Sequence, residues 1–205
     1  MTAMLDTNIV KTDIRVAIVF HSGYGHTARQ AEAVRRGVEK VPGVSVLYLT
    51  SEEAQARLDD LSGADAIIFG APTYMGSASA PFKAFMDTTS SVFVSGAWRD
   101  KIAAGFTNSA SRSGDKLSTL MQLAILAAQL GMHWVNLGLL PGNNLSTGSE
   151  ADLNRLGFFL GAGSQSNADE GPEVAPPQSD LLTAEHLGER VAMVALQMVR
   201  GRVAA

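Results

Sequence analysis

A short run of glycines and hydroxyl-bearing residues follows the first strongly apolar stretch of the chain. It reads His21-Ser-Gly-Tyr-Gly-His-Thr27. Hydroxyls, together with glycines that let backbone amides turn inward at the start of a helix, are the groups that hold a phosphate. The run contains no Lys or Arg, so it indicates a single phosphate held by backbone N–H groups and hydroxyls. A glycine-rich turn that serves only as a tight connection is the alternative.

The same run differs from two familiar nucleotide motifs. A P-loop continues with Gly-Lys-Ser/Thr, which is missing here. The dinucleotide fingerprint has its first two glycines at Gly23 and Gly25, but Ala28 stands where the third is expected. The dinucleotide interpretation is therefore weakened without being excluded.

Two later segments supply groups of another kind. In Ala71-Pro-Thr-Tyr-Met-Gly-Ser77, an aromatic ring and a thioether can contact a flat ligand, and Gly76 permits its close approach. The segment Asn108-Ser-Ala-Ser-Arg-Ser-Gly114 is small and polar. Each segment alone fits an ordinary turn. Together with the first run they indicate one shared crevice, because each follows a predicted strand.

The elements that must position these segments alternate along the chain. Short apolar runs typical of buried parallel strands are separated by amphipathic stretches. We expect strands at 16–20, 44–49, 66–70, 102–107 and 133–137. We expect helices at 27–41, at 51–61, after Ser79 with Pro81 in the first turn, at 117–130, and from about Thr183. This alternation predicts an α/β fold with a doubly wound parallel sheet, in which ligands bind beyond the carboxyl ends of the strands.

Composition excludes several classes of function. The chain has 205 residues, of which 46% are hydrophobic, and this suits one domain with a full core. A net charge of −4 argues against a nucleic-acid partner. No apolar run reaches the roughly 18 residues of a membrane span. With no cysteine and no ligand spacing among the 4 histidines, we expect no metal site, and redox chemistry would need a borrowed cofactor.

The chain divides into an expected N-terminal extension, residues 1–14, and a single domain, residues 15–205. The extension lacks the unbroken apolar run of a secretory signal, so we expect a cytoplasmic protein. Residues 138–182 are rich in Gly, Asn, Ser and Pro and predict a long loop. A loop of that length is uncommon unless it covers a ligand or grips a partner chain.

With these segments the chain resembles the flavodoxin-like superfamily, and within it the tryptophan-repressor-binding-protein type of NAD(P)H:quinone oxidoreductase. The resemblance covers roughly residues 15 to 140. It rests on the segments 21–27 and 65–76, and on Phe85-Met-Asp87 followed by Ser95-Gly-Ala97. It implies FMN as the cofactor. It also implies a five-stranded sheet of order 2-1-3-4-5 within a three-layer α/β/α fold.

The resemblance assigns a role to each segment. Contacts to the FMN phosphate fall to Ser22, Tyr24, Gly25, His26 and Thr27. Contacts to the flavin ring fall to Pro72, Thr73, Tyr74, Met75 and Gly76. Further ring or ribityl contacts fall to Asn108, Ser109, Ala110, Ser111, Arg112 and Ser113. Tyr24 would also touch the nicotinamide, and Phe93 would line the substrate side of the ring.

The expected function is an FMN-dependent oxidoreductase that transfers hydride from NAD(P)H to a quinone or a similar small aromatic acceptor. Such a transfer needs no side-chain nucleophile, so we assign no catalytic acid or base. The alternative is a flavodoxin-type electron carrier with protein partners. Carriers tend to present a strongly acidic face, whereas here 16 basic residues nearly balance 20 acidic ones. Apolar residues within 139–175 favour a homodimer or homotetramer.

Overall fold

The strands form at the unbroken apolar runs of the sequence. The computed structural model describes residues 13–204. Five parallel strands follow the order β2-β1-β3-β5-β6. The short strand β4 has two residues and pairs antiparallel with β3, outside this row. When only the five parallel strands are numbered along the chain, their order is the predicted 2-1-3-4-5. The strands are β1 (Ile14–Phe20), β2 (Val44–Thr50), β3 (Ala66–Tyr74), β4 (Ser77–Ala78), β5 (Ile102–Ser109), β6 (His133–Trp134) and β7 (Ala162–Gln165).

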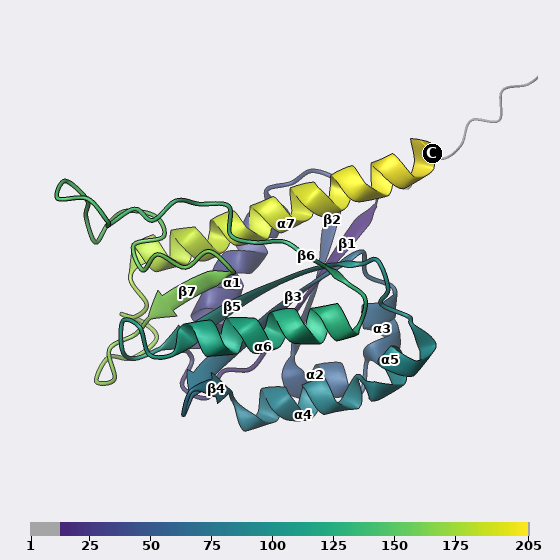
Figure 1. Cartoon of the computed structure of the whole chain (residues 1–205), viewed down its shortest axis with the longest axis horizontal. Helices are drawn as coiled ribbons and strands as arrows, with labels where there is room; N and C mark the ends of the chain where they lie inside the picture. The colour runs from purple at the N-terminus through teal and green to yellow at the C-terminus, as the bar shows by residue number, and fades with distance from the viewer. Residues whose placement is uncertain (1–12, 205) are drawn as a thin grey trace, which may run out of the picture.

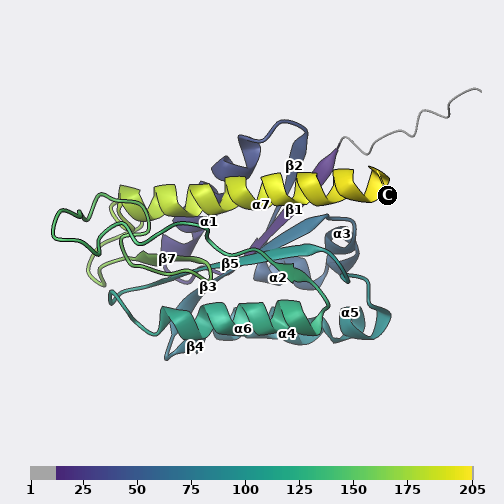
Figure 2. The same ribbon diagram turned by 45° about the horizontal axis from the view of Figure 1, so that its top comes forward.

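Helices cover both faces of this sheet, which confirms the three-layer fold. On one face lie α1 (His26–Glu39) and α7 (Gln178–Ala204). The other layer holds α2 (Ser51–Gln55), α3 (Leu58–Ser62), α4 (Ala80–Thr88), α5 (Ser90–Ser95) and α6 (Lys116–Gln129). Figures 1 and 2 show α7 above the strands and α4 and α6 below them.

Alternate side chains of each central strand feed two separate cores. In β1, Val16 and Ile18 pack toward α1 and α7, whereas Ala17 and Val19 pack toward α2, α3, α4 and α6. All four are fully buried. This explains why the central strands are apolar without interruption, since a strand covered on both faces has no side for polar residues.

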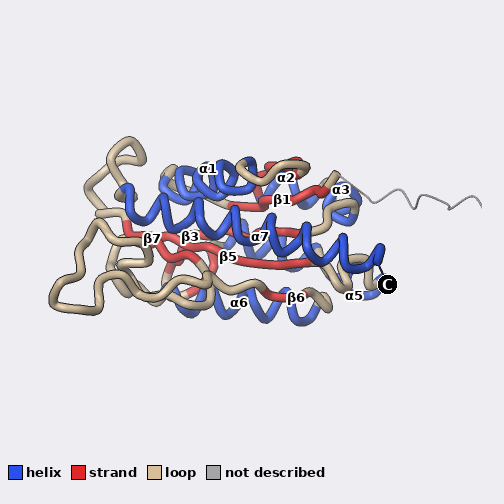
Figure 3. Tube along the Cα trace, turned by 90° about the horizontal axis from the view of Figure 1, so that it is seen from above, coloured by secondary structure: helices blue, strands red, loops and turns tan. Residues whose placement is uncertain are grey.

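Two glycines set the distance between α1 and α7. A Cβ atom on Gly37 would lie 1.8 Å from the carbonyl oxygen of Glu185, and one on Gly188 would lie 2.0 Å from that of Val34. The helix backbones therefore touch directly, and Figure 3 shows the two helices side by side over the strands. Glu185 also pairs with Lys40 and Arg36, which lowers the pKa of the Glu185 carboxyl.

The edge of the sheet differs from the sequence expectation. The predicted fifth strand, 133–137, pairs with β5 only at His133 and Trp134. The other half of the β5 edge is occupied by β7, which pairs with Phe106 to Ser109. A Cβ on Gly161, just before β7, would lie 2.2 Å from the oxygen of Gly105, so this approach requires glycine. The segment 138–182 is therefore not all loop: it holds β7, and α7 begins at Gln178 rather than near Thr183.

Three further boundaries differ from expectation. The helix predicted at 51–61 is divided into α2 and α3. Ser79 occupies the N-cap position of α4, but its hydroxyl bonds to His21 Nδ1 at 2.8 Å instead of capping the helix. Most of the expected extension 1–14 lies outside the described residues, and its last residue, Ile14, is the first of β1. Across residues 13–204, no helix has both the length and the apolarity that a bilayer span requires.

Candidate functional site

The first candidate loop joins β1 to the start of α1. Gly25 is the N-cap of α1 with a φ of 88°, a left-handed conformation that favours glycine. The Ser22 hydroxyl accepts a hydrogen bond from the Ala28 amide at 3.1 Å. No acidic residue occupies the first turn of α1. The helix dipole therefore favours an anion at this end of the helix.

The second loop is the tight turn between β3 and β4. Met75 and Gly76 both have positive φ, 48° and 79°, and the Met75 side chain is completely exposed. A positive φ is uncommon for a residue other than glycine, and Met75 adopts it beside the cleft. Tyr74 forms an edge-to-face pair with Tyr24, with ring centroids 6.3 Å apart. Burial raises the pKa of the Tyr74 hydroxyl, and Tyr24 adds to the effect.

Buried hydrogen bonds hold the strand ends beneath this turn. Thr73 Oγ1 lies 2.8 Å from the hydroxyl oxygens of both Thr107 and Thr119, and Thr107 donates to the carbonyl of Ala71 at 2.6 Å. The floor of the site is thus fixed by bonds between β3, β5 and α6. A satisfied, buried network of this kind gives a rigid platform.

The third loop is anchored by a lysine that sequence reasoning did not single out. Lys116 is fully buried, and its ammonium donates to the carbonyls of Ser111 and of Arg112, the latter at 3.1 Å. Burial lowers the pKa of Lys116 to about 8, an effect that Asp180 opposes and Arg155 increases. The loop preceding α6 is therefore built around a buried ammonium group.

A fourth segment completes the site; it belongs to the long loop expected at 138–182, within which the sequence singled out no residue. Residues 166–172 follow β7 and lie against the first loop. His26 Nε2 is 2.9 Å from the carbonyl oxygen of Glu170, and a Cβ on Gly25 would lie 2.8 Å from the ring of Pro172. Asn108 Nδ2 donates to the hydroxyls of Ser164 and Ser166 at 2.8 and 2.9 Å. The only signal for this segment was the Gly-, Asn- and Ser-rich composition of the predicted loop.

These four segments enclose a cleft of about 820 Å³ at the carboxyl ends of the strands. This volume lies within the range of about 300–1,000 Å³ typical of cofactor sites. The structure brings eleven predicted residues together around it: Ser22, Tyr24, His26, Thr27, Pro72, Thr73, Tyr74, Met75, Asn108, Ser109 and Ala110. The wall missed from sequence consists of Ser166, Asn167, Ala168, Glu170 and Gly171.

Other predicted residues lie outside the cleft lining. Gly25 and Gly76 shape the adjoining turns, and Ser111 and Ser113 belong to the third loop away from the cleft. Arg112 turns away to pair with Glu150. Phe93 is on α5, which Figures 1 and 2 place at the end of the molecule opposite β4 and β7. Within a single chain, Phe93 therefore does not line the cleft, because the amino-terminal ends of the strands separate it from the site.

The cleft lining offers two chemically different kinds of group that fit FMN. Hydroxyls and the amino end of α1 suit a phosphate, while Pro72, Tyr74 and Met75 offer flat and apolar surface for a ring system. Among residues 13–204, no group of three or more His, Asp or Glu side chains is placed to hold a metal ion.

Comparison with known families decides the class of this site. The model of the family described as NADPH-dependent FMN reductase matches residues 28–143, more than half of the chain. The chain belongs to this family. As an FMN reductase family member it is a flavodoxin-like oxidoreductase that binds FMN and uses NAD(P)H as co-substrate.

Individual relatives of this FMN reductase family member carry two kinds of name. A flavodoxin, FldP, of Pseudomonas aeruginosa is 43% identical over 90% of this chain and 98% of its own length. An NAD(P)H dehydrogenase (quinone) of Aromatoleum aromaticum is 32% identical over 93% of this chain and 100% of its own. A crystal structure of a WrbA-like flavodoxin from Agrobacterium tumefaciens has a TM-score of 0.69 and 38% identity, covering 90% of this chain and 99% of that one.

Proposed function

We propose that this protein transfers hydride from NAD(P)H, through bound FMN, to a quinone or a similar small aromatic acceptor. The observation that carries the proposal is the cleft at the strand ends, with anion-binding groups at one end and exposed aromatic and thioether side chains at its rim. Tyr24 is 76% exposed there, and Met75 is fully exposed. A rim of this kind leaves one face of a bound ring accessible to a second flat molecule.

The residues of the cleft take distinct roles in this proposal. The hydroxyls of Ser22 and Thr27 and the backbone near Gly25 hold the FMN phosphate. Pro72, Thr73, Tyr74 and Met75 hold the ring, and Asn108 and Ser109 contact the ribityl chain or the ring edge. FMN bound there would supply the hydride chemistry that links the nicotinamide to the acceptor.

Positioning is the task of the remaining groups. The Tyr24–Tyr74 pair provides an aromatic wall against which a nicotinamide or an acceptor ring can stack. The threonine network behind Thr73 keeps the wall from shifting as the two ligands exchange. Hydride transfer from the nicotinamide carbon needs no side-chain acid or base, so none is assigned.

A flavodoxin-type electron carrier is the second candidate, and a specific observation favours it: the relative at 43% identity is named a flavodoxin. Against it, acidic and basic residues are nearly balanced, at 20 and 16. Without a strongly acidic face, a carrier loses the charge complementarity that speeds encounter with protein partners.

The deciding experiment is anaerobic stopped-flow spectroscopy of the FMN-loaded protein. We expect NADPH or NADH to bleach the oxidised-flavin absorbance rapidly, and benzoquinone to restore it. A bound flavin that neither nucleotide bleaches, but that a protein reductase reduces, would replace the enzyme with the carrier.

The assembly we propose is a homodimer or homotetramer formed in part by α6. After Lys116, this helix carries no charged residue. Its outer face exposes Leu117, Met121 and Ile125, each about half exposed at 50%, 49% and 55%. Leu140 and Phe159, in the region expected to be apolar and exposed, are 83% and 59% exposed. Uncharged helix faces of this kind suit a second copy of the same chain.

A further inference from the structure

A second, more polar cavity of about 540 Å³ adjoins the FMN cleft. Asn167 and Glu170 line both spaces, so a ligand that fills the cleft can extend into the second cavity along the surface of this chain. An NAD(P)H molecule stacked on the ring has an adenosine end that must lie beyond the cleft. The second cavity is therefore a candidate for that end.

Two guanidinium groups converge on one carboxylate in this cavity. Arg155 Nη1 donates to Glu150 Oε2 at 2.6 Å, and Arg112 Nη2 donates to Glu150 Oε1. These bonds, that of Arg112 first, lower the pKa of the Glu150 carboxyl. Since the Arg112 and Glu150 side chains are 59% and 55% exposed, their contact stabilises the protein little and is easily exchanged.

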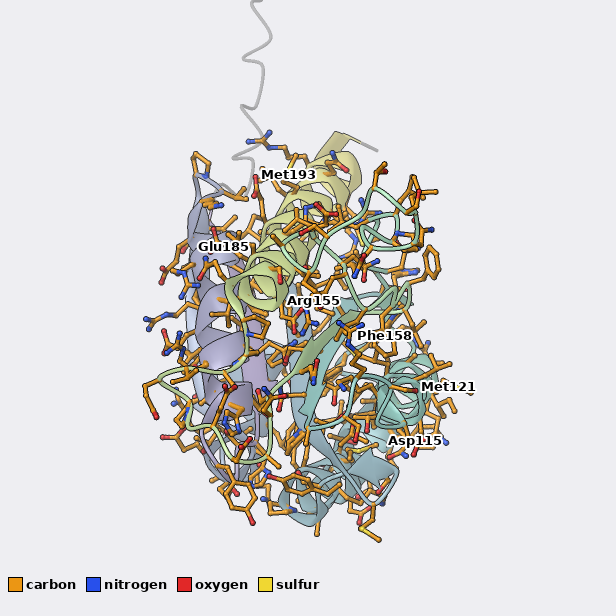
Figure 4. The ribbon with its side chains drawn as sticks, turned by 90° about the vertical axis from the view of Figure 1, so that its left-hand side faces the viewer. Asp115, Met121, Arg155, Phe158, Glu185 and Met193 are labelled. Atoms are coloured by element: carbon orange, nitrogen blue, oxygen red, sulfur yellow. The ribbon has the colours of Figure 1, made fainter. Side chains whose placement is uncertain are left out.

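Arg155 is held much more firmly than Arg112. Its side chain is only 5% exposed, and its Nε and Nη2 each lie 2.8 Å from a carboxylate oxygen of Asp180, which is 2% exposed. Figure 4 places Arg155 beside the first turns of α7, where Asp180 lies. This bidentate pair fixes the guanidinium and leaves Nη1 directed at Glu150. The cavity thus contains a preorganised cationic donor.

We propose that this cavity binds the phosphate monoester that distinguishes NADPH from NADH, and that the phosphate displaces Glu150 from Arg112 and Arg155. The inference rests on the proposed function, because the nicotinamide must first occupy the cleft. A phosphate monoester carries nearly two negative charges and three acceptor oxygens, so it can receive both guanidinium groups at once. The side-chain amides of Gln165 and Asn167, which now bond to each other at 3.3 Å, add further donors.

The charges around the cavity make Glu150 a competitor for the same position. Arg112 and Arg155 both pair with Glu150, Arg155 also pairs with Asp180, and Glu170 lines the same cavity. The ammonium of Lys116 lies close enough to interact with Asp180 and Arg155. A doubly charged phosphate that entered while Glu150 kept its position would be repelled by the Glu150 carboxylate, in addition to those of Asp180 and Glu170. Removing the charge of Glu150 should therefore tighten phosphate binding, whereas removing Arg112 should weaken it.

The test uses calorimetry on the FMN-loaded protein with 2′,5′-ADP and 5′-AMP as probes, which differ only in the 2′-phosphate. We expect 2′,5′-ADP to bind at least about ten-fold more tightly. Arg112→Gln should reduce this difference, because only Arg155 would remain to receive the 2′-phosphate, and Glu150→Gln should increase it. Arg57→Gln removes an exposed arginine from a comparable pair with Asp60 and should change neither affinity.

Several outcomes would overturn the site. These are equal binding of the two probes, an Arg112→Gln variant that keeps the wild-type difference, or displacement of 2′,5′-ADP by inorganic phosphate at the same concentration. Steady-state rates separate this inference from the proposed function. Equal rates of quinone reduction with NADH and with NADPH would support the proposed function and contradict the phosphate site. If neither NADH nor NADPH supports quinone reduction, but 2′,5′-ADP still binds more tightly than 5′-AMP, the proposed function is wrong and the phosphate site stands.

Discussion

At the scale of single residues, Gly25 carries two constraints at once. Its φ of 88° is left-handed, and a Cβ would press against Pro172 at 2.8 Å. We expect Gly25→Ala to destabilise the protein by about 1–2 kcal/mol through backbone strain. Because the clash also separates the first loop from residues 166–172, FMN should bind at least about ten-fold more weakly. Thermal unfolding and FMN fluorescence titration measure the two effects.

Gly96 provides the matched control for that substitution. It has a φ of 67°, but the nearest atom to an added Cβ, on Arg99, lies 3.8 Å away, and it belongs to the end of α5 remote from the cleft. Gly96→Ala should lose stability and keep FMN affinity. Equal FMN affinities in both variants would contradict the role given to the contact between Gly25 and Pro172.

Lys116 makes stability depend on pH in a defined window. Its pKa is about 8 in the fold, against an ordinary value of 10.5. Between these values the unfolded chain retains a proton that the folded chain has released, so the free energy of unfolding should rise with pH. The contribution is at most about 1.4 kcal/mol per pH unit. Below pH 8 the lysine is charged in both states, and its burial is a constant cost.

Chemical denaturation at several pH values above 7.5 measures this rise. Lys116→Met removes the titrating group. The free energy of unfolding of this variant should therefore rise less steeply with pH than that of the wild type. If the variant and the wild type rose in parallel from pH 8 to 10, the buried ammonium would not be the source.

Sequence reasoning at the residue scale succeeded where a side chain's type reveals its use. Ser22, Thr27 and Tyr74 were selected for hydroxyls and a ring, and all three line the cleft. Lys116 escaped notice because a lysine at a helix start is ordinarily solvated. Arg112 was placed in a loop beside the cleft, but its direction depends on Glu150, 38 residues away in sequence.

At the scale of elements, the closeness of α1 and α7 depends on Gly37 and Gly188. Gly37→Ala or Gly188→Ala would place a methyl group within 2.0 Å of a backbone carbonyl, which no side-chain rotation relieves. We expect each to reduce the free energy of unfolding by about 1–3 kcal/mol or more, as overpacking does. Urea unfolding followed by circular dichroism measures the change.

A glycine near the end of α7 separates packing from helix propensity. Gly201 is in the same helix, and nothing lies within 4 Å of an added Cβ. Gly201→Ala should therefore raise stability, by up to about 1 kcal/mol, because alanine favours the helix. A loss at Gly201 equal to that at Gly188 would remove the packing explanation.

Elements with long or periodic apolar patterns were predictable, and the short ones were not. The strands β1, β3 and β5 each contain an apolar run that is buried in the structure, and such a run is visible in the sequence. The strand β7, Ala-Gly-Ser-Gln, has no β-branched or aromatic residue. It becomes a strand because it completes the edge of β5, which is a tertiary cause without a local signal.

At the scale of the whole molecule, the outer face of α6 determines the expected assembly. Leu120, Leu123 and Leu126 are buried, whereas Met121 is about half exposed, at 49%. The sequence could not distinguish these two faces of α6, because both are apolar. We expect light scattering at micromolar concentration with FMN to give a dimer or tetramer. Met121→Glu should shift it toward the monomer, because a charge would be buried in the interface.

Met193→Glu is the control for that change. Met193 is 47% exposed on α7, and Figure 4 shows it well apart from Met121. This variant should assemble like the wild type. A monomeric wild type, or equal dissociation of both variants, would reject α6 as the interface.

The segment between β6 and β7 connects two strands that both pair with the same neighbour, β5. Its two ends are joined where the Leu137 amide donates to the Phe159 carbonyl at 3.0 Å. Residues 138–158 are thus an excursion with fixed anchors, and lengthening it would cost only the slow, logarithmic entropy of a longer loop. Glu150 and Arg155 lie on this excursion, whereas Ser22, Thr73 and Tyr74 do not. A change confined to this excursion would therefore alter the proposed choice of electron donor without replacing any side chain that lines the FMN cleft from β1 or β3.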